Sequence, residues 1–355
     1  MNLDDLSQFR KIDVQDMLSQ INGLPDQLQI AWNLGSSLPL PVPQGMQGVQ
    51  SVVISGMGGS AIGADLLSAY IAPLCPVPVI VHRDYGLPGW VKDARTLLIA
   101  SSHSGDTEET LSSFEAARHR GCKILTISTG GKLADEAHKA GAPAWEFKHH
   151  GMPRAAVGFS FGLLLAAFVR LGLVPDASQD MQEAISVMRQ LQPEIKPESP
   201  VAKNLAKRLA GQLVGRWVNI FGAGYLAPVA RRWKGQVNEL AKGWAQFEFL
   251  PEADHNTLAG LVNPPDLVQK MMSLFLRAPS DHPRNRLRSD LTRQACMQEG
   301  MNTDYVDALG KGPLAHIWSL LLYGDYVGYY LSMAYAIDPT PIDALFAFKD
   351  AMNKG

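Results

Sequence analysis

VQSVVISGMGGSAIGADLLSAYIA, residues 49–72, joins a short apolar run to a glycine-rich turn and then to an apolar helical pattern. A continuous β-branched run bounded by turn residues is typical of a strand that is buried on both faces of a sheet. A helix directly after such a strand is typical of a crossover to a parallel neighbour. The segment therefore predicts a strand–helix unit of a parallel α/β sheet.

The same alternation continues along the chain. Further strands are predicted in VPVIVHRDY, RTLLIAS and CKILTIST. The pattern starts again in RWVNIFGAGYLAPVARRWKGQVNELAKG, residues 216–243, and WAQFEFLP and KMMSLFLRAP predict additional strands. The glycine turns of the two parts occupy comparable places, which indicates two similar halves. We expect two doubly wound α/β domains, each a parallel sheet flanked by helices in three layers.

The segments between these patterns set the expected domain boundaries. Helical spacing extends to about Ser37 with a break at Gly23–Pro25, and the proline-rich residues 36–45 predict an extended connector. Residues 176–200 predict a polar helix that joins the halves. We expect an N-terminal helical segment and linker over 1–45, a first domain over 46–195, and a second domain with C-terminal helices over 196–355.

The composition narrows the classes of function. A chain of 355 residues with 46% hydrophobic content can bury a sizeable core. The formal net charge is -2 with both signs mixed along the chain, which is unlike the basic surface of a nucleic-acid-binding or membrane-surface protein. Cys75, Cys122 and Cys296 lie far apart without metal-ligand spacing, and predict buried free thiols in a reducing cytoplasm.

No targeting or membrane-spanning segment is expected. The N-terminus is polar and acidic, unlike a secretory signal. The two most apolar stretches, residues 159–174 and 317–337, contain Arg170 and Asp325 respectively. Both stretches predict buried helices, so we expect a cytoplasmic protein.

Three loops of the first half carry small polar residues where strands end: GMGGSA, SSHSGDT and STGGK. Ligands of open parallel sheets bind beyond the carboxyl ends of the strands, where N–H groups at helix starts favour anions. The hydroxyls of Ser60, Ser102, Ser104 and Thr107 can each donate to a phosphate oxygen. The P-loop pattern GxxxxGK[ST] is missing, which disfavours a nucleoside triphosphate with magnesium. The loops predict a monophosphate site.

Two alternative interpretations of these loops stay open. Gly56, Gly58 and Ala61 fit a dinucleotide fingerprint, and Asp84 ends the next strand where an acid could hold a ribose. This alternative, a nicotinamide-dependent enzyme, leaves the hydroxyl-rich loop unexplained. Tight strand–helix turns also use glycine and serine without any ligand.

The sequence does not indicate a metal site or a nucleophilic triad. His149 and His150 are adjacent, so they cannot both face one metal from a regular helix, and no cysteine lies nearby. The elbow pattern GxSxG does not occur. We expect no metal.

An ordered set of motifs resembles the sugar isomerase (SIS) domain family and, more narrowly, the phosphoglucose isomerase superfamily. The set covers most of the chain and consists of GMGGSAIGADL, SHSGDTEETL, GMPRAAVGFSFG, KGQVNELAKG, DHN and PTPIDALFAFK. Residues 102–107 are similar to the family's SxSGxT phosphosugar loop. The chain departs from the family at His103, Asp106 and Thr257, where tyrosine, asparagine and an acidic residue are frequent, and these departures bear on substrate range.

The resemblance implies an isomerase that interconverts fructose 6-phosphate with glucose 6-phosphate and mannose 6-phosphate through a cis-enediol(ate). It implies a homodimer without a cofactor, with the active site between domains and between subunits. The substrate-binding positions that it implies are Gly58, Gly59 and Ser60 beside the sugar and Ser102, Ser104 and Thr107 at the phosphate. The catalytic positions that it implies are Arg154, Glu239, His255 and Lys349.

These residue types suit the reaction, which needs a base, a group that opens the sugar ring, and positive charge near the developing oxyanion. Glu239 suits the base, with Gln236 and Lys242 one turn away. His255 follows a predicted strand in a polar loop, and histidine ordinarily titrates near neutral pH. Arg154 begins an apolar helix, where a cation opposes the helix dipole, so a ligand-facing role is favoured.

Taken singly, these four residues would be ordinary surface side chains, and Lys349 is selected by its family position alone. A non-catalytic sugar-phosphate sensor on the same fold is the alternative function.

Overall fold

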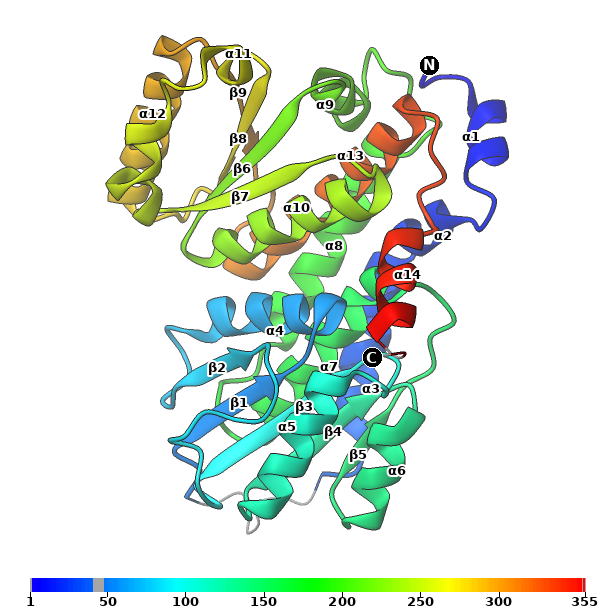
Figure 1. Cartoon of the computed structure of the whole chain (residues 1–355), viewed down its shortest axis with the longest axis vertical. Helices are drawn as coiled ribbons and strands as arrows, with labels where there is room; N and C mark the ends of the chain where they lie inside the picture. Colours follow the sequence, from blue (N-terminus) through cyan, green and yellow to red (C-terminus); the bar gives the residue numbers. More distant parts are fainter. Residues whose placement is uncertain (1, 41–47, 353, 355) are drawn as a thin grey trace. The chain divides into compact units, whose positions relative to one another are not determined.

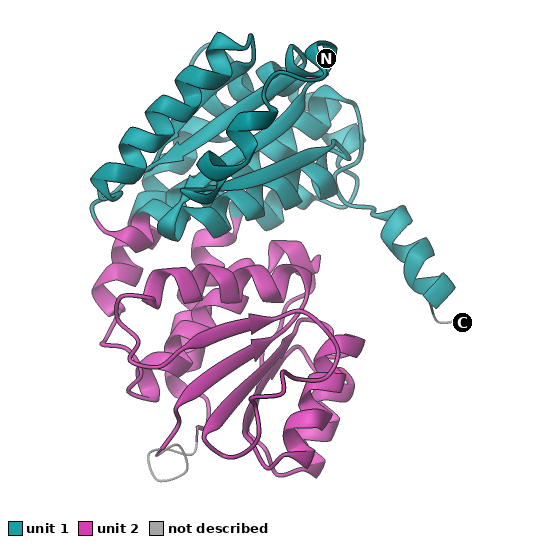
Figure 2. Ribbon diagram, turned by 60° about the vertical axis from the view of Figure 1, so that its left-hand side comes forward, with its two compact units in different colours: residues 1–22, 187–311, 316–355 teal, residues 23–186, 312–315 magenta. Residues whose placement is uncertain are grey.

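The computed structural model describes residues 2–40, 48–352 and 354 (Figure 1). It divides into two compact units, coloured separately in Figure 2. Unit 1 comprises residues 1–22, 187–311 and 316–355, and unit 2 comprises residues 23–186 and 312–315. Most of the expected extended connector, residues 41–45, lies outside the described residues, and the boundaries expected at residues 45 and 195 stay a prediction.

Unit 2 is built on a parallel sheet with the strand order β2-β1-β3-β4-β5. The strands are β1 (Ser51–Ser55), β2 (Val79–His82), β3 (Thr96–Ser102), β4 (Lys123–Ser128) and β5 (Ala144–Glu146). The central strand β3 is buried along its whole length, as a strand covered on both faces must be. The prediction of a parallel α/β sheet from the β-branched runs is confirmed for this unit.

Helices cover both faces of this sheet (Figure 1). They are α3 (Leu24–Ser37), α4 (Gly58–Ile71), α5 (Glu108–His119), α6 (Gly131–Lys139) and α7 (Val157–Arg170). The first part of α8 (Ser178–Ile195) also belongs to this unit. On one face, Phe114 of α5 and Leu133 of α6 pack with Val53 and Leu98 of the strands. On the other face, α7 packs against both α3 and α4, and its apolar residues are almost all buried.

Unit 1 contains a second parallel sheet with the order β7-β6-β8-β9. Its strands are β6 (Trp217–Ala223), β7 (Ala245–Leu250), β8 (Met271–Arg277) and β9 (Asn302–Asp307). The edge strand β9 has the sequence NTDYVD and is mostly half-buried. Because it carries no apolar run, the sequence pattern gives no sign of it.

The helices of unit 1 come from both ends of the chain. They are α1 (Leu6–Ile12), α2 (Met17–Asn22), α9 (Leu205–Leu213), α10 (Ala227–Leu240), α11 (Pro265–Val268), α12 (Pro283–Gln298), most of α13 (Pro313–Ala334) and α14 (Asp343–Met352). Phe9 of α1 packs against Tyr329 and Tyr330 of α13. This aromatic contact joins the N-terminal residues to the C-terminal half of the chain.

The packing of α10 on α13 fixes the helix that carries Glu239. Arg232 of α10 forms an ion pair of 2.8 Å with Asp325 of α13, and both side chains are buried. Gln236 donates to the same carboxylate, and the Trp233 indole N–H donates to the Leu320 carbonyl oxygen at 2.9 Å. A charge at the centre of an apolar helix is tolerated here because it is paired and hydrogen-bonded. No helix among the described residues is both long enough and apolar enough to cross a bilayer.

The three cysteines are free thiols. Cys296 is buried, and burial raises the pKa of its thiol to about 11. Cys75 and Cys122 are only half-buried, so the expectation of three buried thiols is wrong for these two. Both lie next to turns, where the chain reaches the surface.

Candidate active site

The hydroxyl-rich loop after β3 is held in shape by its own side chains. Ser102 Oγ lies 2.8 Å from Thr107 Oγ1 and accepts a hydrogen bond of 3.1 Å from the Gly105 N–H. Ser104 Oγ accepts from the Asp106 N–H at 3.2 Å. Gly105 has φ +77°, a left-handed conformation that glycine adopts without strain. These bonds order the loop before any ligand binds.

The loop keeps donors for an anion. A hydroxyl has one hydrogen, so when Ser102 and Thr107 share one hydrogen bond, the hydrogen of the acceptor hydroxyl stays free for a ligand. Ser104 accepts from backbone and is exposed, so its own hydrogen can also be donated. The arrangement therefore supplies at least two hydroxyl donors at the carboxyl end of β3.

Two helices start beside these donors. Neither α4 nor α5 has a side chain that caps its first turn. The first N–H groups of a helix have no partner within the helix and carry partial positive charge. Uncapped helix starts of this kind bind phosphate groups.

The third loop, STGGK, is hydrogen-bonded to the hydroxyl-rich loop. The Leu133 N–H at the start of α6 donates to the Gly105 carbonyl oxygen at 2.9 Å, and the Lys132 N–H donates to the Asp106 carboxylate at 3.2 Å. Because these two N–H groups are already paired with the hydroxyl-rich loop, α6 supports that loop. The prediction that STGGK itself binds an anion stays a prediction.

Arg154 lies against the glycine-rich loop. It belongs to the 3-10 turn Pro153–Ala155 just before α7 and is 3% exposed. A Cβ on Gly59 would lie 2.5 Å from the Pro153 carbonyl oxygen and 3.4 Å from the Arg154 Cα. Unit 2 thus brings together Gly58, Gly59 and Ser60 and the predicted Arg154.

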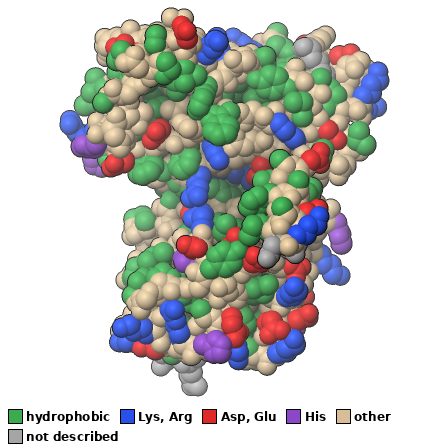
Figure 3. All heavy atoms as spheres, viewed as in Figure 1, with side chains coloured by type: hydrophobic (Ala, Val, Ile, Leu, Met, Phe, Trp, Pro, Cys, Tyr) green, Lys and Arg blue, Asp and Glu red, His purple; other side chains and the backbone are tan. Residues whose placement is uncertain are grey.

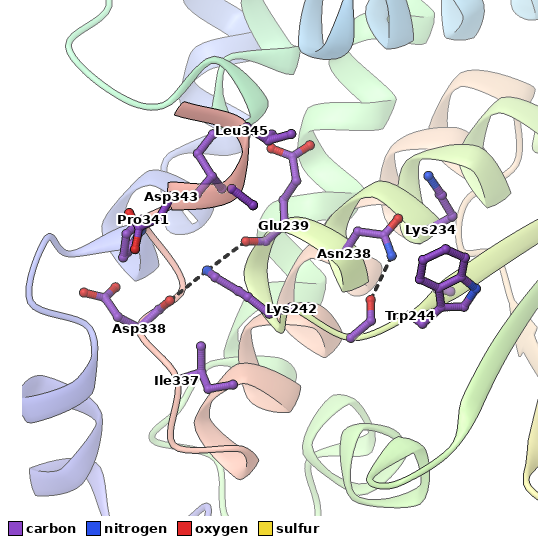
Figure 4. A pocket seen from close by; sticks show the side chains of 14 residues that line it. Lys234, Asn238, Glu239, Lys242, Trp244, Ile337, Asp338, Pro341, Asp343 and Leu345 are labelled. Atoms are coloured by element: carbon purple, nitrogen blue, oxygen red, sulfur yellow. Dashed lines mark hydrogen bonds between the residues drawn. The ribbon is translucent and has the colours of Figure 1, made fainter. Parts of the chain in front are cut away.

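Glu239 lines a cavity of about 830 Å³ within unit 1 (Figure 4). The cavity is bounded by the end of α10, the start of β7 and residues 337–345. Figure 4 shows the Glu239 carboxylate beside Leu345 of α14. The Lys242 ammonium donates to the carbonyl oxygens of Glu239 and Asp338, which joins the end of α10 to the segment before α14. Gln236, expected on the same face as Glu239, is buried against Asp325 instead.

His255 and Lys349 occupy exposed positions in unit 1. His255 ends the 3-10 turn Glu252–His255 that follows β7. The preceding Asp254 fixes this turn, because its carboxylate accepts from Arg288 at 2.8 Å and from Thr292 at 2.7 Å. Lys349 lies in the last turn of α14, a helix in which no residue is buried.

Charges of both signs are spread over the surface. Figure 3 shows basic and acidic side chains interspersed on the visible face of each unit. Among the described residues, no group of three histidine, cysteine or acidic side chains is placed to hold a metal ion.

Known proteins similar to this chain identify its family. A bifunctional phosphoglucose/phosphomannose isomerase of Caldicellulosiruptor bescii is 40% identical over 339 residues, which are 95% of this chain and 98% of the relative. The chain belongs to the bifunctional phosphoglucose/phosphomannose isomerase family. An Aquifex aeolicus member is 32% identical over 307 residues, covering 86% of this chain and 91% of that protein.

A family model matches the second half of the chain, and a solved structure shares its fold. The model of the bacterial phospho-glucose isomerase C-terminal SIS domain matches residues 202–352. A tagatose-6-phosphate ketose/aldose isomerase from Escherichia coli superposes with a TM-score of 0.71 at 16% identity, over 90% of this chain and 93% of that one. This likeness confirms the prediction of two SIS-type α/β domains.

Sequence reasoning did not predict several contacts that shape the hydroxyl-rich loop. The Thr129 hydroxyl donates to the His103 carbonyl oxygen at 2.7 Å, and Asp106 accepts from the start of α6. Each contact joins residues about 26 positions apart. No local motif signals such a pair, so the sequence alone could not indicate it.

Proposed function

We propose that this chain catalyses the interconversion of fructose 6-phosphate with glucose 6-phosphate and with mannose 6-phosphate. Family membership supports the reaction. The observation that carries the substrate class is the loop Ser102–Thr107, with free hydroxyl hydrogens beside the uncapped starts of α4 and α5. This combination suits a phosphate monoester, which is small and carries negative charge.

In the proposed reaction, Ser102, Ser104 and Thr107 bind the phosphate while Gly58, Gly59 and Ser60 border the sugar. Glu239 removes the proton from C2 of the open-chain aldose phosphate and returns it to C1. In the enediolate the hydroxyl proton of O2 passes to O1, so the ketose forms without net loss of a proton. Starting from mannose 6-phosphate, the same enediolate forms because the two aldoses differ only at C2.

Two cations and a histidine complete the proposed set. The Arg154 guanidinium stays charged at any working pH and stabilises the enediolate oxygen. His255 exchanges a proton with the ring oxygen when the sugar ring opens. Lys349 adds positive charge near the reacting carbons.

The function is tested with the purified chain and fructose 6-phosphate, with no metal or nucleotide added. We expect both glucose 6-phosphate and mannose 6-phosphate to form, each measured with its own coupled enzyme. A sugar-phosphate sensor would instead be stabilised thermally by fructose 6-phosphate without forming either aldose. A nicotinamide-dependent enzyme would be stabilised by NAD. Either result in place of turnover would reject the isomerase.

We further propose a cytoplasmic homodimer in which a complete active site draws Glu239 and His255 from different chains. The free thiols Cys75, Cys122 and Cys296 support a reducing compartment. Mixing Glu239→Gln with His255→Ala chains then creates mixed dimers with one intact site out of two. After reassociation, we expect about one quarter of the wild-type activity, because half of the dimers are mixed. Activity equal to the sum of the separate variants would show that each site uses a single chain.

A further inference from the structure

A pair of histidines lies beside the hydroxyl-rich loop of unit 2. His103 Nε2 is 2.9 Å from His149 Nδ1, and the two rings meet edge to face. Both rings contact phenylalanines, since His103 packs against Phe147 and His149 against Phe159, which stack on each other. Burial and then the charge of His149 lower the pKa of His103 to about 4, and burial also lowers the pKa of His149. The rings are therefore neutral at physiological pH, and one N–H donates to the other ring's lone pair.

His103 also connects the loops around it through its backbone. Its N–H donates at 3.2 Å to Oγ of Ser60, in the first turn of α4, the helix that follows β1. Its carbonyl oxygen accepts from the Thr129 hydroxyl at 2.7 Å and from the Thr129 N–H at 3.0 Å, in the loop after β4. With the bond to His149, which follows β5, His103 links the chain segments at the carboxyl ends of four strands.

The second histidine of the pair, His149, lies a few residues before Arg154 in the sequence. His149 belongs to the segment between β5 and the turn Pro153–Ala155. Phe159, against which His149 packs, is in the first turn of α7 directly after that turn. Arg154 is thus flanked on both sides in sequence by residues that contact the histidine pair.

We propose that His103 and His149 are positioning residues whose hydrogen bond ties the segment bearing Arg154 to the phosphate-binding loop. The inference rests on the proposed function of Arg154 in isomerisation. The pair should affect the chemical step and not phosphate binding. The hydroxyls of Ser102, Ser104 and Thr107 are held by hydrogen bonds within their own loop, and none of these bonds involves an imidazole ring. A shift of a catalytic group by about 1 Å can lower a rate by about a hundredfold.

The test compares kcat and KM for fructose 6-phosphate in His149→Leu, His103→Leu, the double variant and His149→Asn. We expect His149→Leu to lower kcat by about 10- to 100-fold while KM and the inhibition constant of inorganic phosphate change by less than about threefold. The Asn amide places a polar atom two bonds from Cβ, as Nδ1 is, so His149→Asn should recover most of kcat. Because the two rings act as one unit, the double variant should be no worse than the poorer single variant.

The control is His119→Leu, which removes an exposed histidine at the end of α5 and should leave kcat unchanged. Circular dichroism and a thermal melt establish that each variant is folded. A Leu variant with unchanged kcat, a parallel loss of phosphate affinity, additive effects in the double variant, or failure of Asn to rescue would each overturn the inference.

A measurement without turnover separates this inference from the proposed function. Nitrogen NMR of labelled wild-type protein at pH 7 should show two neutral histidines that share a hydrogen bond, and His149→Leu should remove the signature. Two histidines without that bond would overturn the inference even in an active enzyme. A wild-type chain with the bond but without isomerase activity would reject the proposed function, and the positioning role would fall with it.

Discussion

Glu239→Gln is expected to lower kcat for fructose 6-phosphate isomerisation by about 10³-fold, because general acid–base groups contribute about 10²- to 10⁴-fold to a rate. The amide has the size of the carboxylate but cannot accept the proton that is removed from C1 of fructose 6-phosphate. The α10 helix should keep its place, since its position depends on the buried Arg232, Trp233 and Gln236 contacts with α13. Inhibition by inorganic phosphate should therefore be unchanged.

The matched control is Glu299→Gln, which makes the same substitution at an exposed position after α12. It should leave kcat, KM and the melting temperature unchanged. If Glu239→Gln kept more than about a tenth of the wild-type kcat, the loss would fall below the usual range for a general base, and the base would have to be another residue.

Gly105→Ala should destabilise the protein by about 3 kcal/mol, the sum of a left-handed backbone without glycine and an overpacked contact. A Cβ at this position would lie 1.9 Å from the Gly130 carbonyl oxygen, which belongs to backbone and cannot rotate away. The clash would separate the hydroxyl-rich loop from the start of α6. We therefore expect weaker inhibition by inorganic phosphate as well as a lower midpoint in urea unfolding.

Gly121→Ala separates the cost of the left-handed backbone from the cost of the overpacked contact. Gly121 has φ +67°, close to the +77° of Gly105, but a Cβ there would meet nothing within 4 Å. Gly121→Ala should lower the free energy of unfolding only by the cost of the left-handed backbone, about 1 kcal/mol. Inhibition by inorganic phosphate should be unchanged. Equal losses in the two variants would show that the contact with Gly130 is not what requires glycine at residue 105.

The sequence predicted those parts of the fold that depend on local patterns. The buried strands β1 and β3 contain continuous apolar runs, and β6 is apolar apart from Asn219, so the local pattern identifies them. The polar edge strand β9 pairs with β8 through backbone bonds and needs no apolar run. Likewise, α1 packs in unit 1 through contacts such as that of Phe9 with the aromatic rings of α13, more than 300 residues away in the chain.

The candidate site likewise has a part that the sequence predicted and a part that it could not predict. The hydroxyls of Ser102, Ser104 and Thr107 are evident as an unusual local concentration of donors, and the structure orders them around Gly105. The contacts that hold this loop come from elsewhere in the chain, from α6 and from His149. Composition and spacing cannot indicate which distant residue supplies a hydrogen-bond partner, so these supports become visible only with coordinates.

The division of the chain between the two units also bears on its synthesis. Unit 2 lacks only residues 312–315 once residue 186 has been made, whereas unit 1 needs residues from both ends of the chain. Domains generally fold as units while the ribosome is still adding residues. On the ribosome, unit 2 is therefore nearly complete early, whereas residues 1–22 first meet partners such as Gln192 and Lys207 and pack against α13 only later. Residues 1–22 are thus synthesised well before α13, whose rings Phe9 contacts in the folded unit.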